Sequence, residues 1–346
     1  MAVEVYFLPI EKIKNLSDFL EWTGIFDFIE EGDVIALKIH FGNSKHNNHI
    51  PSKYSKEIVE IIKKRKCLSF FTDTNVLYRG ERENTISHIK VVYLHNYHNL
   101  GVPVVIAGGS SGKDEVVLKV DGNHFKEIYV AKEYTEIDGM IALTHFKGHM
   151  LSGIGGTIKN IGMGCASRKG KYAMHANIVP QISHSGCVGC GSCVKECPVG
   201  AIELRNKKAY IDEEKCIGCA SCVHACPEKV ISIPWSSVSP SEFQERLVEY
   251  AKGVITQYGN KFCAINFLIN IASDCDCASN PGEILSPDIG VLVSKDPVAI
   301  DKASTDLIKE VNGKDVFEGI KPPYKYQLEY GEKINLGSLN YNLVSF

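Results

Sequence analysis

Short apolar runs alternate with segments of helical periodicity along most of the chain. Apolar runs predict strands at residues 3–8, 34–39, 67–72, 102–106, 138–144, 262–271 and 289–293. Apolar residues at helical spacing predict helices at 13–29, 56–65, 85–97, 239–258 and 297–311. Helices that alternate with apolar strands are typical of layered folds. The pattern therefore predicts an α/β fold in which a largely parallel or mixed sheet is flanked by helices.

The alternation is interrupted over residues 184–234. Two short strands are predicted there at 201–204 and 209–212, around the turn Asn206-Lys207-Lys208. The sequence thus predicts a discontinuous α/β domain, residues 1–183 and 235–346, with a small domain of residues 184–234 inserted late.

Composition and charge bear on whether the protein spans a membrane, binds nucleic acid or is secreted. The 346 residues are 44% hydrophobic, which is enough apolar material for a sizeable core. No apolar run approaches the length of a membrane span, and a net charge of -3 with mixed signs is unlike a nucleic-acid-binding surface. The N-terminus Met1-Ala2-Val3-Glu4-Val5 lacks a basic and apolar leader pattern. We therefore expect a cytoplasmic protein that binds neither nucleic acid nor membrane.

Eight cysteines of the inserted segment form two copies of one spacing, C-x2-C-x2-C-x3-C-P. This is the run by which bacterial ferredoxins hold [4Fe-4S] clusters, with the fourth cysteine of each run directed at the other cluster. The spacing therefore predicts two [4Fe-4S] clusters in a ferredoxin-like domain. One would be held by Cys187, Cys190, Cys193 and Cys226, and the other by Cys216, Cys219, Cys222 and Cys197.

Other interpretations of these cysteines fit less well. Zinc sites use CxxC pairs separated by a longer spacer, and disulfides require an oxidising compartment. A further alternative is that both clusters serve only as structural staples. Two adjacent clusters with crossed ligands favour electron transfer.

Polar residues follow several predicted strands, and ligand sites of such sheets lie beyond the carboxyl ends of the strands. The residues that we expect to form a catalytic site are Lys38, His40, His145, His149, Lys159, Cys275 and Cys277. The glycine-rich segment 152–160 is typical of an anion cradle, with Gly153, Gly155, Gly156 and Lys159 as its binding residues. A purely structural glycine turn is the alternative.

The pair Cys275-x-Cys277 leaves three interpretations open. Residues two apart in an extended chain point to the same side, so both thiols would face one pocket. With nearby histidines they could bind a further metal ion or cluster. The alternatives are two idle thiols and a redox-active thiol pair.

Motifs outside the cysteine runs carry a family resemblance. They are Lys38-Ile39-His40-Phe41-Gly42, His145-Phe146-Lys147-Gly148-His149, the stretch 153–165, Asp274-Cys275-Asp276-Cys277 and the stretch 294–301. Together they resemble the DUF362 family of iron-sulfur proteins over nearly the whole chain. The resemblance implies the domain plan and the clusters, and it assigns no substrate.

These features lead to one principal hypothesis. The two clusters would relay electrons between an external donor or acceptor protein and a site in the α/β domain, which would take an anionic small molecule; an oxidoreductase is the enzyme class implied. The main alternative is a non-catalytic electron carrier or assembly factor that recognises a protein partner. A third is a non-redox enzyme in which the clusters are scaffolding.

Overall fold

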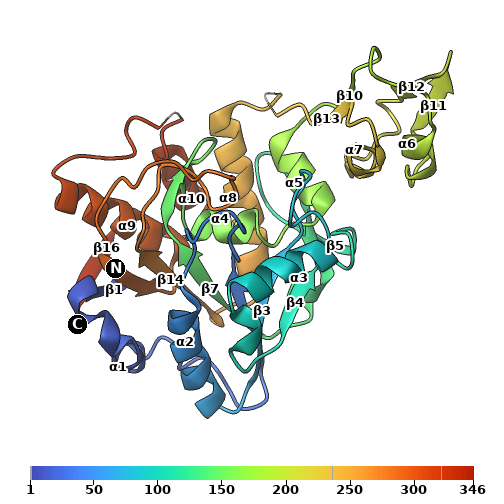
Figure 1. Ribbon diagram of the computed structural model, residues 1–346. Coiled ribbons are helices and arrows are strands. Elements are labelled where there is room, and N and C mark those ends of the chain that lie inside the picture. The colour runs from blue at the N-terminus through green and yellow to red at the C-terminus, as the bar shows by residue number, and fades with distance from the viewer. Residues whose placement is uncertain (1, 236, 321) are drawn as a thin grey trace.

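An eight-stranded mixed sheet organises the chain in the computed structural model, which describes residues 2–235, 237–320 and 322–346 (Figure 1). The strand order is β16-β1-β15-β14-β7-β2-β3-β4. In the same order the strands are Tyr341–Ser345, Val3–Pro9, Gly290–Ser294, Phe262–Leu268, Gly139–His145, Val34–Ile39, Leu68–Thr74 and Val104–Ala107. The predicted α/β class with a largely parallel or mixed sheet is confirmed.

Five neighbouring strands of this sheet, β14, β7, β2, β3 and β4, run parallel to one another. The strand β15 is antiparallel to both β14 and β1, and β16 joins β1 in parallel. The five parallel strands therefore deliver their carboxyl ends to a single edge of the sheet, where ligand sites of such folds form.

Helices cover both faces of the sheet. One face packs against α1 (Leu16–Trp22), α2 (Ser52–Lys64) and α3 (Thr85–Leu94). The other packs against α4 (Thr157–Gly162), α8 (Pro240–Thr256), α9 (Pro297–Asn312) and α10 (Lys325–Lys333). Strand β2 shows why both faces are apolar: Ile35, Leu37 and Ile39 belong to the first core and Ala36 to the second, because successive strand side chains point to opposite faces.

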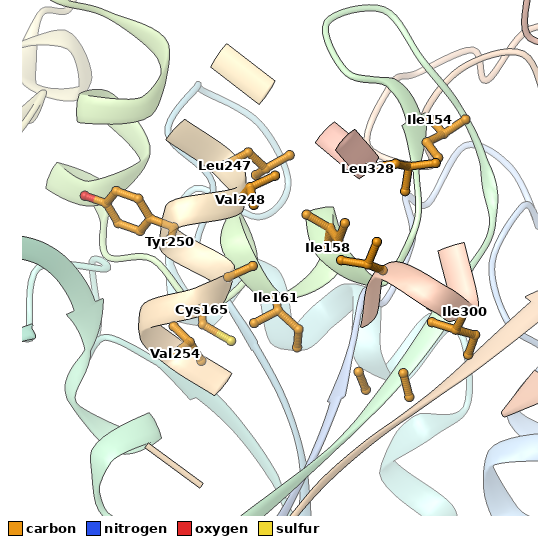
Figure 2. Close-up of a cluster of buried hydrophobic side chains, with 14 of the residues drawn as sticks. Ile154, Ile158, Ile161, Cys165, Leu247, Val248, Tyr250, Val254, Ile300 and Leu328 are labelled. Carbon is orange, nitrogen blue, oxygen red and sulfur yellow. The ribbon is translucent and has the colours of Figure 1, made fainter. Parts of the chain in front are cut away.

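The core around α4 is shown in Figure 2. Ile158 and Ile161 of α4 lie between the sheet and the side chains of Leu247 and Val254 on α8. Both isoleucines are fully buried. This packing fixes the short helix α4, and with it the loop that precedes the helix.

The segment with the two cysteine runs stands apart from the large sheet (Figure 1). It contains its own small core, built around Ile202, Val223 and Ile231 together with several of the cysteines. Its elements are β10 (Gln181–Ile182) paired with β13 (Ile231–Ser232), β11 (Ile202–Arg205) paired with β12 (Lys208–Ile211), α6 (Ser192–Lys195) and α7 (Ser221–Ala225). The hairpin β11–β12 is close to the predicted one.

Several elements differ from the sequence prediction. The single helix predicted at 13–29 is wrong: a 3₁₀ turn η1 (Ile10–Asn15) leads into α1, which ends at Trp22, and Gly24 follows with a φ of +62° that a continuing helix does not allow. The sequence prediction also missed β16 and α10. Further short elements are η2 (Tyr97–Asn99), β5 (Glu115–Lys119), β6 (Glu127–Ala131), η3 (Lys132–Thr135), β8 (Lys147–His149), β9 (Gly153–Gly155) and α5 (Arg168–His175).

Among the described residues, the helices are all too short or too polar to cross a bilayer.

The core position of Ile161 generates a stability prediction. Ile161→Ala removes fully buried methyl groups between α4, α8 and the sheet, so it should lower the free energy of unfolding by about 2–5 kcal/mol in urea titrations. Ile86→Ala is the matched control, because Ile86 is 75% exposed on α3 and should change the value by about 0.5 kcal/mol or less. Equal effects of the two substitutions would contradict the described packing.

Candidate functional site

A cavity of about 450 Å³ lies at the carboxyl edge of the parallel strands. Lys38 and His40 reach it from the end of β2, Asp73 from the end of β3, and His145 from the end of β7. The loop between β7 and α4 and the segment 76–82 complete its walls. This is the place expected for a ligand site in such a sheet.

Buried ion pairs form the base of the cavity. The Nζ of Lys38 lies 3.0 Å from Asp73 Oδ1, and the Nζ of Lys147 lies 2.8 Å from Asp276 Oδ2. Burial alone would raise the pKa of Asp73 and of Asp276, but the neighbouring cations hold the pKa of each carboxyl below its usual value. Each buried ammonium is therefore neutralised by its carboxylate partner, because no water reaches the pair to solvate either charge.

Two further cations lie near the Asp73 carboxylate, whose charge acts on both of them. Arg82 and Lys171 are both buried, line the cavity, and form no ion pair within the part of the chain that the structure describes. Lys171 donates hydrogen bonds to the Thr74 hydroxyl and the Ala166 carbonyl. Burial lowers the pKa of Lys171 to about 7, so this ammonium can lose its proton near neutral pH. The site therefore favours anions and contains a group able to transfer a proton.

Apolar side chains form the remaining wall of the cavity. They include Leu77, Leu151, Trp235 and Phe243. The ring of His175 stacks on that of Phe243, with centroids 4.7 Å apart, and burial lowers the pKa of His175 to about 3. A neutral imidazole among aromatic rings extends the apolar surface. The cavity thus joins a charged region to an apolar wall.

The three predicted site histidines have different surroundings. His145 Nδ1 lies 2.9 Å from both oxygens of Asp276, and its Nε2 lies 2.7 Å from the Ile269 carbonyl oxygen. Both nitrogens thus face acceptors, which makes His145 a donor that positions Asp276. The amides of Leu151 and Ser152 donate to His149 Nδ1, so the proton of this ring is on Nε2.

Charge and burial keep the other two imidazoles neutral. Burial first, and then the nearby Arg82 and lysine cations, hold the pKa of His40 well below its usual value. Burial and the ammonium of Lys159 do the same for the pKa of His149. His149 can therefore donate a hydrogen bond from Nε2 without adding charge.

A tight turn brings the two thiols of Cys275 and Cys277 together. The amide of Ala278 donates to the Cys275 carbonyl at 2.9 Å, so the segment is a turn and not the extended chain assumed from the sequence. Cys275 is buried beside Lys159 Nζ at 3.1 Å, while Cys277 lines the cavity. The hydrogen bond from Cys277, and then the cation of Lys159, hold the pKa of Cys275 well below its usual value.

A metal ion is not favoured at this thiol pair. Of the described residues, no three His, Cys, Asp or Glu side chains lie close enough together to hold a single ion. His145 is committed to Asp276, and the neighbour of Cys275 is the ammonium of Lys159, which repels a cation. The structure places an ammonium beside Cys275, and the additional metal or cluster at the two thiols stays a prediction.

The glycine-rich segment is not an open anion cradle. The carboxylate of Asp301 accepts hydrogen bonds from the amides of Thr157 and Ile158, at 2.7 and 2.9 Å, so an internal acid occupies the helix start. Gly155 and Gly156 line the cavity as predicted from the sequence, and Lys159 does too. Gly153 is outside the cavity lining; with a φ of +72°, it packs its Cα against the Tyr324 backbone. The cradle prediction is corrected accordingly.

The eight cysteines of the inserted segment surround two separate small cavities. The first is lined by all four members of the predicted set Cys187, Cys190, Cys193 and Cys226. The second is lined by the other predicted set, Cys197, Cys216, Cys219 and Cys222. Each set combines three cysteines of one run with the last cysteine of the other, as the crossed arrangement of a two-cluster ferredoxin requires. The four cysteines of each set thus line one shared space.

The segment Leu77–Arg79 connects the inserted segment to the large cavity. The side chain of Leu77 lines the cavity and also belongs to the core that contains Cys222 and Cys226. The guanidinium of Arg79 donates to the carbonyls of Val223, His224 and Cys226. Leu77 thus touches both the cysteine segment and the cavity, Tyr78 lines the cavity, and Arg79 binds the cysteine segment.

Sequence reasoning did not include Asp73, Arg82, Lys171 or His175 among the site residues. A signal existed for Asp73, because Asp73-Thr74-Asn75 closes a predicted strand. Arg82, Lys171 and His175 come from a loop and a helix, and their convergence depends on long-range packing.

The family model "Domain of unknown function (DUF362)" matches residues 35–306, which is more than half of the chain. The chain belongs to the DUF362 family. No curated protein matches it. This DUF362 chain resembles a Thermotoga maritima protein of known crystal structure at 10% identity and a TM-score of 0.43, over 93% of this chain and 59% of that one. The lactate racemase apoprotein from Thermoanaerobacterium thermosaccharolyticum is 12% identical with a TM-score of 0.37, over 77% of this chain and 50% of that one. The chain thus spans 59% of the length of the first protein and 50% of the second.

The pKa of Lys171 generates a prediction for pH dependence. In the folded state it is about 7, against 10.5 for an ordinary lysine, so between these values the unfolded chain holds a proton that the folded chain lacks. The free energy of unfolding should therefore rise with pH over this window, by up to about 1.4 kcal/mol per pH unit from this group. Lys171→Met should remove that contribution in urea titrations at pH 7 to 10.

The control is Lys56→Met, because the side chain of Lys56 is 60% exposed. Its pH dependence should match that of the wild type. Parallel curves for the wild type and Lys171→Met would contradict the lowered pKa.

Proposed function

We propose that this protein is an iron–sulfur oxidoreductase in which two [4Fe-4S] clusters exchange electrons with a substrate bound in the large cavity. The observation that carries the proposal is the arrangement of the eight cysteines into two crossed sets of four, each around its own space. Such sets match the ligands of a two-cluster ferredoxin, whose clusters accept and donate single electrons. The electrons would come from, or pass to, an external redox protein.

The contacts of Leu77 and Arg79 support coupling between the clusters and the cavity. Helix α7 lies directly against this segment and has Cys222 within it and Cys226 next to its end. A cavity that shares a wall residue with the cysteine core is close to the electron source. The inserted segment would then serve as an electron conduit to this site.

The cavity supports an anionic substrate with an apolar part. Arg82 and Lys171 offer positive charge for an acid group, and Trp235 and Phe243 offer apolar contacts. Lys171 is suited to deliver a proton, since its pKa of about 7 lets it act as donor and acceptor near neutrality. His149 is suited to orient the substrate through Nε2–H. Electron transfer coupled to proton transfer is the reaction that these residues serve best.

Metal analysis tests the clusters. Protein purified without oxygen should contain about eight iron atoms per chain. Cys190→Ser and Cys222→Ser each remove one ligand from a different set, so each should lose about half of the iron and the EPR signal of one reduced cluster. Cys67→Ser, outside both sets, should keep the full iron content. Zinc in place of iron, or full iron in both ligand variants, would refute the proposal.

Ligand binding tests the substrate class. The chain has two tryptophans, so Trp22→Phe leaves Trp235 in the cavity wall as the sole indole fluorophore. Phenylacetate should quench this fluorescence at saturating concentration, and the neutral phenylacetamide should bind more weakly. Arg82→Met should weaken phenylacetate binding about tenfold or more, since a hydrogen bond to a charged group contributes about 1.5–3 kcal/mol.

The matched control is Arg65→Met, because Arg65 pairs with Glu21 and Asp27 and does not belong to the cavity lining. Its affinity for phenylacetate should equal that of the parent. Equal binding of the acid and the amide would argue against an anionic substrate.

A further inference from the structure

We propose that Cys275 and Cys277 form a dithiol/disulfide couple that takes up two electrons from the two clusters, one from each, and passes them on as a pair. The inference rests on the proposed function for its electron source. It assigns a chemical task to two thiols that the cluster sets do not use.

The geometry of the turn provides both thiols of such a couple. Cys275 is fully enclosed and sits 3.1 Å from the ammonium of Lys159, whereas Cys277 opens onto the cavity. The two cysteines lie in one tight turn, closed by the hydrogen bond from the Ala278 amide to the Cys275 carbonyl, and only Asp276 separates them along the chain. One sulfur is thus held as a thiolate by a fixed cation, and the other faces the space where a substrate would bind.

The surroundings of the turn hold this arrangement in place. Between the two cysteines, Asp276 is fully buried and bonded to His145, Lys147 and Asn48. These contacts anchor the backbone of the turn at Asp276. With the backbone anchored, the S–S bond forms and breaks by rotation of the two cysteine side chains toward and away from each other.

A short route connects this turn to the cysteine segment. The hydroxyl of Tyr78 lies 3.4 Å from the Cys277 carbonyl oxygen. Its neighbour Leu77 packs in the core with Cys222, and the Leu77 carbonyl lies 2.8 Å from His224 Nε2 on α7. Consecutive residues thus touch the thiol turn on one side and the second cysteine set on the other.

The reaction balances with the groups present. The oxidised pair contains a Cys275–Cys277 S–S bond. Reduction adds two electrons, one from each cluster, breaks this bond, and adds one proton from the cavity to Cys277, while Cys275 remains a thiolate beside Lys159. Oxidation by a bound two-electron acceptor, such as a small disulfide that bears acid groups, reverses these changes: the acceptor takes both electrons and the Cys277 proton, its S–S bond breaks, and it leaves as one thiol and one thiolate. The couple would convert single electrons into pairs.

One tryptic peptide allows a direct test. Residues 262–295 lie between cleavage sites and contain three cysteines, Cys263, Cys275 and Cys277. The protein is oxidised with diamide without oxygen, denatured in acid and alkylated with N-ethylmaleimide. The peptide should then have one label, on the core residue Cys263. Apart from that label, its mass should be two hydrogen masses below that of the peptide with free thiols, because Cys275 and Cys277 form a disulfide. After treatment with photoreduced methyl viologen, a one-electron donor, the peptide should have three labels.

Variants make the result specific. Cys277→Ser should give two labels under both conditions, and the control Cys67→Ser should behave as the wild type. In Cys222→Ser the pair should still close with diamide and reopen with dithiothreitol, but methyl viologen should reopen it at least tenfold more slowly. A wild-type peptide with three labels after oxidation would overturn the couple, and equal reopening rates in the wild type and Cys222→Ser would overturn the electron route.

The failure of the proposed function has a different signature. Protein that lacks iron but whose peptide still closes and reopens with dithiothreitol would refute the clusters, and therefore the electron source, while the thiol pair itself would remain. Full iron with a pair that never closes would refute only the couple.

Discussion

Burial of positive charge at the carboxyl edge of the parallel strands is the constraint on which the site depends. Lys38, Lys147 and Lys159 are each held against an acid: Asp73, Asp276 and the thiolate of Cys275. Removing one partner of such a pair leaves an uncompensated charge away from water, which is strongly destabilising. The pairs therefore fix the loops that contain them, and the cavity shape follows from that rigidity.

The same electrostatics give the thiol turn its chemistry. A thiolate is stable in a buried position only beside a cation, and Lys159 supplies that cation because α4 presents it beside the turn. Helix α4 in turn is held by Asp301 at its start and by the core in which Ile158 and Ile161 pack. Core packing and the Asp301 cap thus hold α4 in place, and α4 in turn holds Lys159 beside the Cys275 thiol.

The inserted segment is connected to the cavity by the contacts of two residues, Leu77 and Arg79. Arg79 satisfies three carbonyls at α7, and Leu77 contributes to both the small core and the cavity wall. The second cysteine set and the cavity therefore share the packed side chain of Leu77. This proximity is what the proposed relay needs, and it gives the late insertion a structural rationale.

The sequence alone determined the features that depend on local spacing. The apolar runs predicted most strands, and the repeated cysteine spacing predicted both sets of four, because the number of residues between ligands limits which sulfurs can share a space. It also located the edge at which Lys38, His40 and His145 meet, since parallel strands align their carboxyl ends.

Only the tertiary structure decided what those residues touch. Asp301, far along the chain, fills the helix start that appeared open to an anion, and Arg82, Lys171 and His175 join the cavity through long-range packing. The neighbour of Cys275 in the folded protein is the ammonium of Lys159. Spacing along a chain fixes which groups lie near each other locally, whereas the charge, burial and partner of each group depend on segments that meet only in the folded protein.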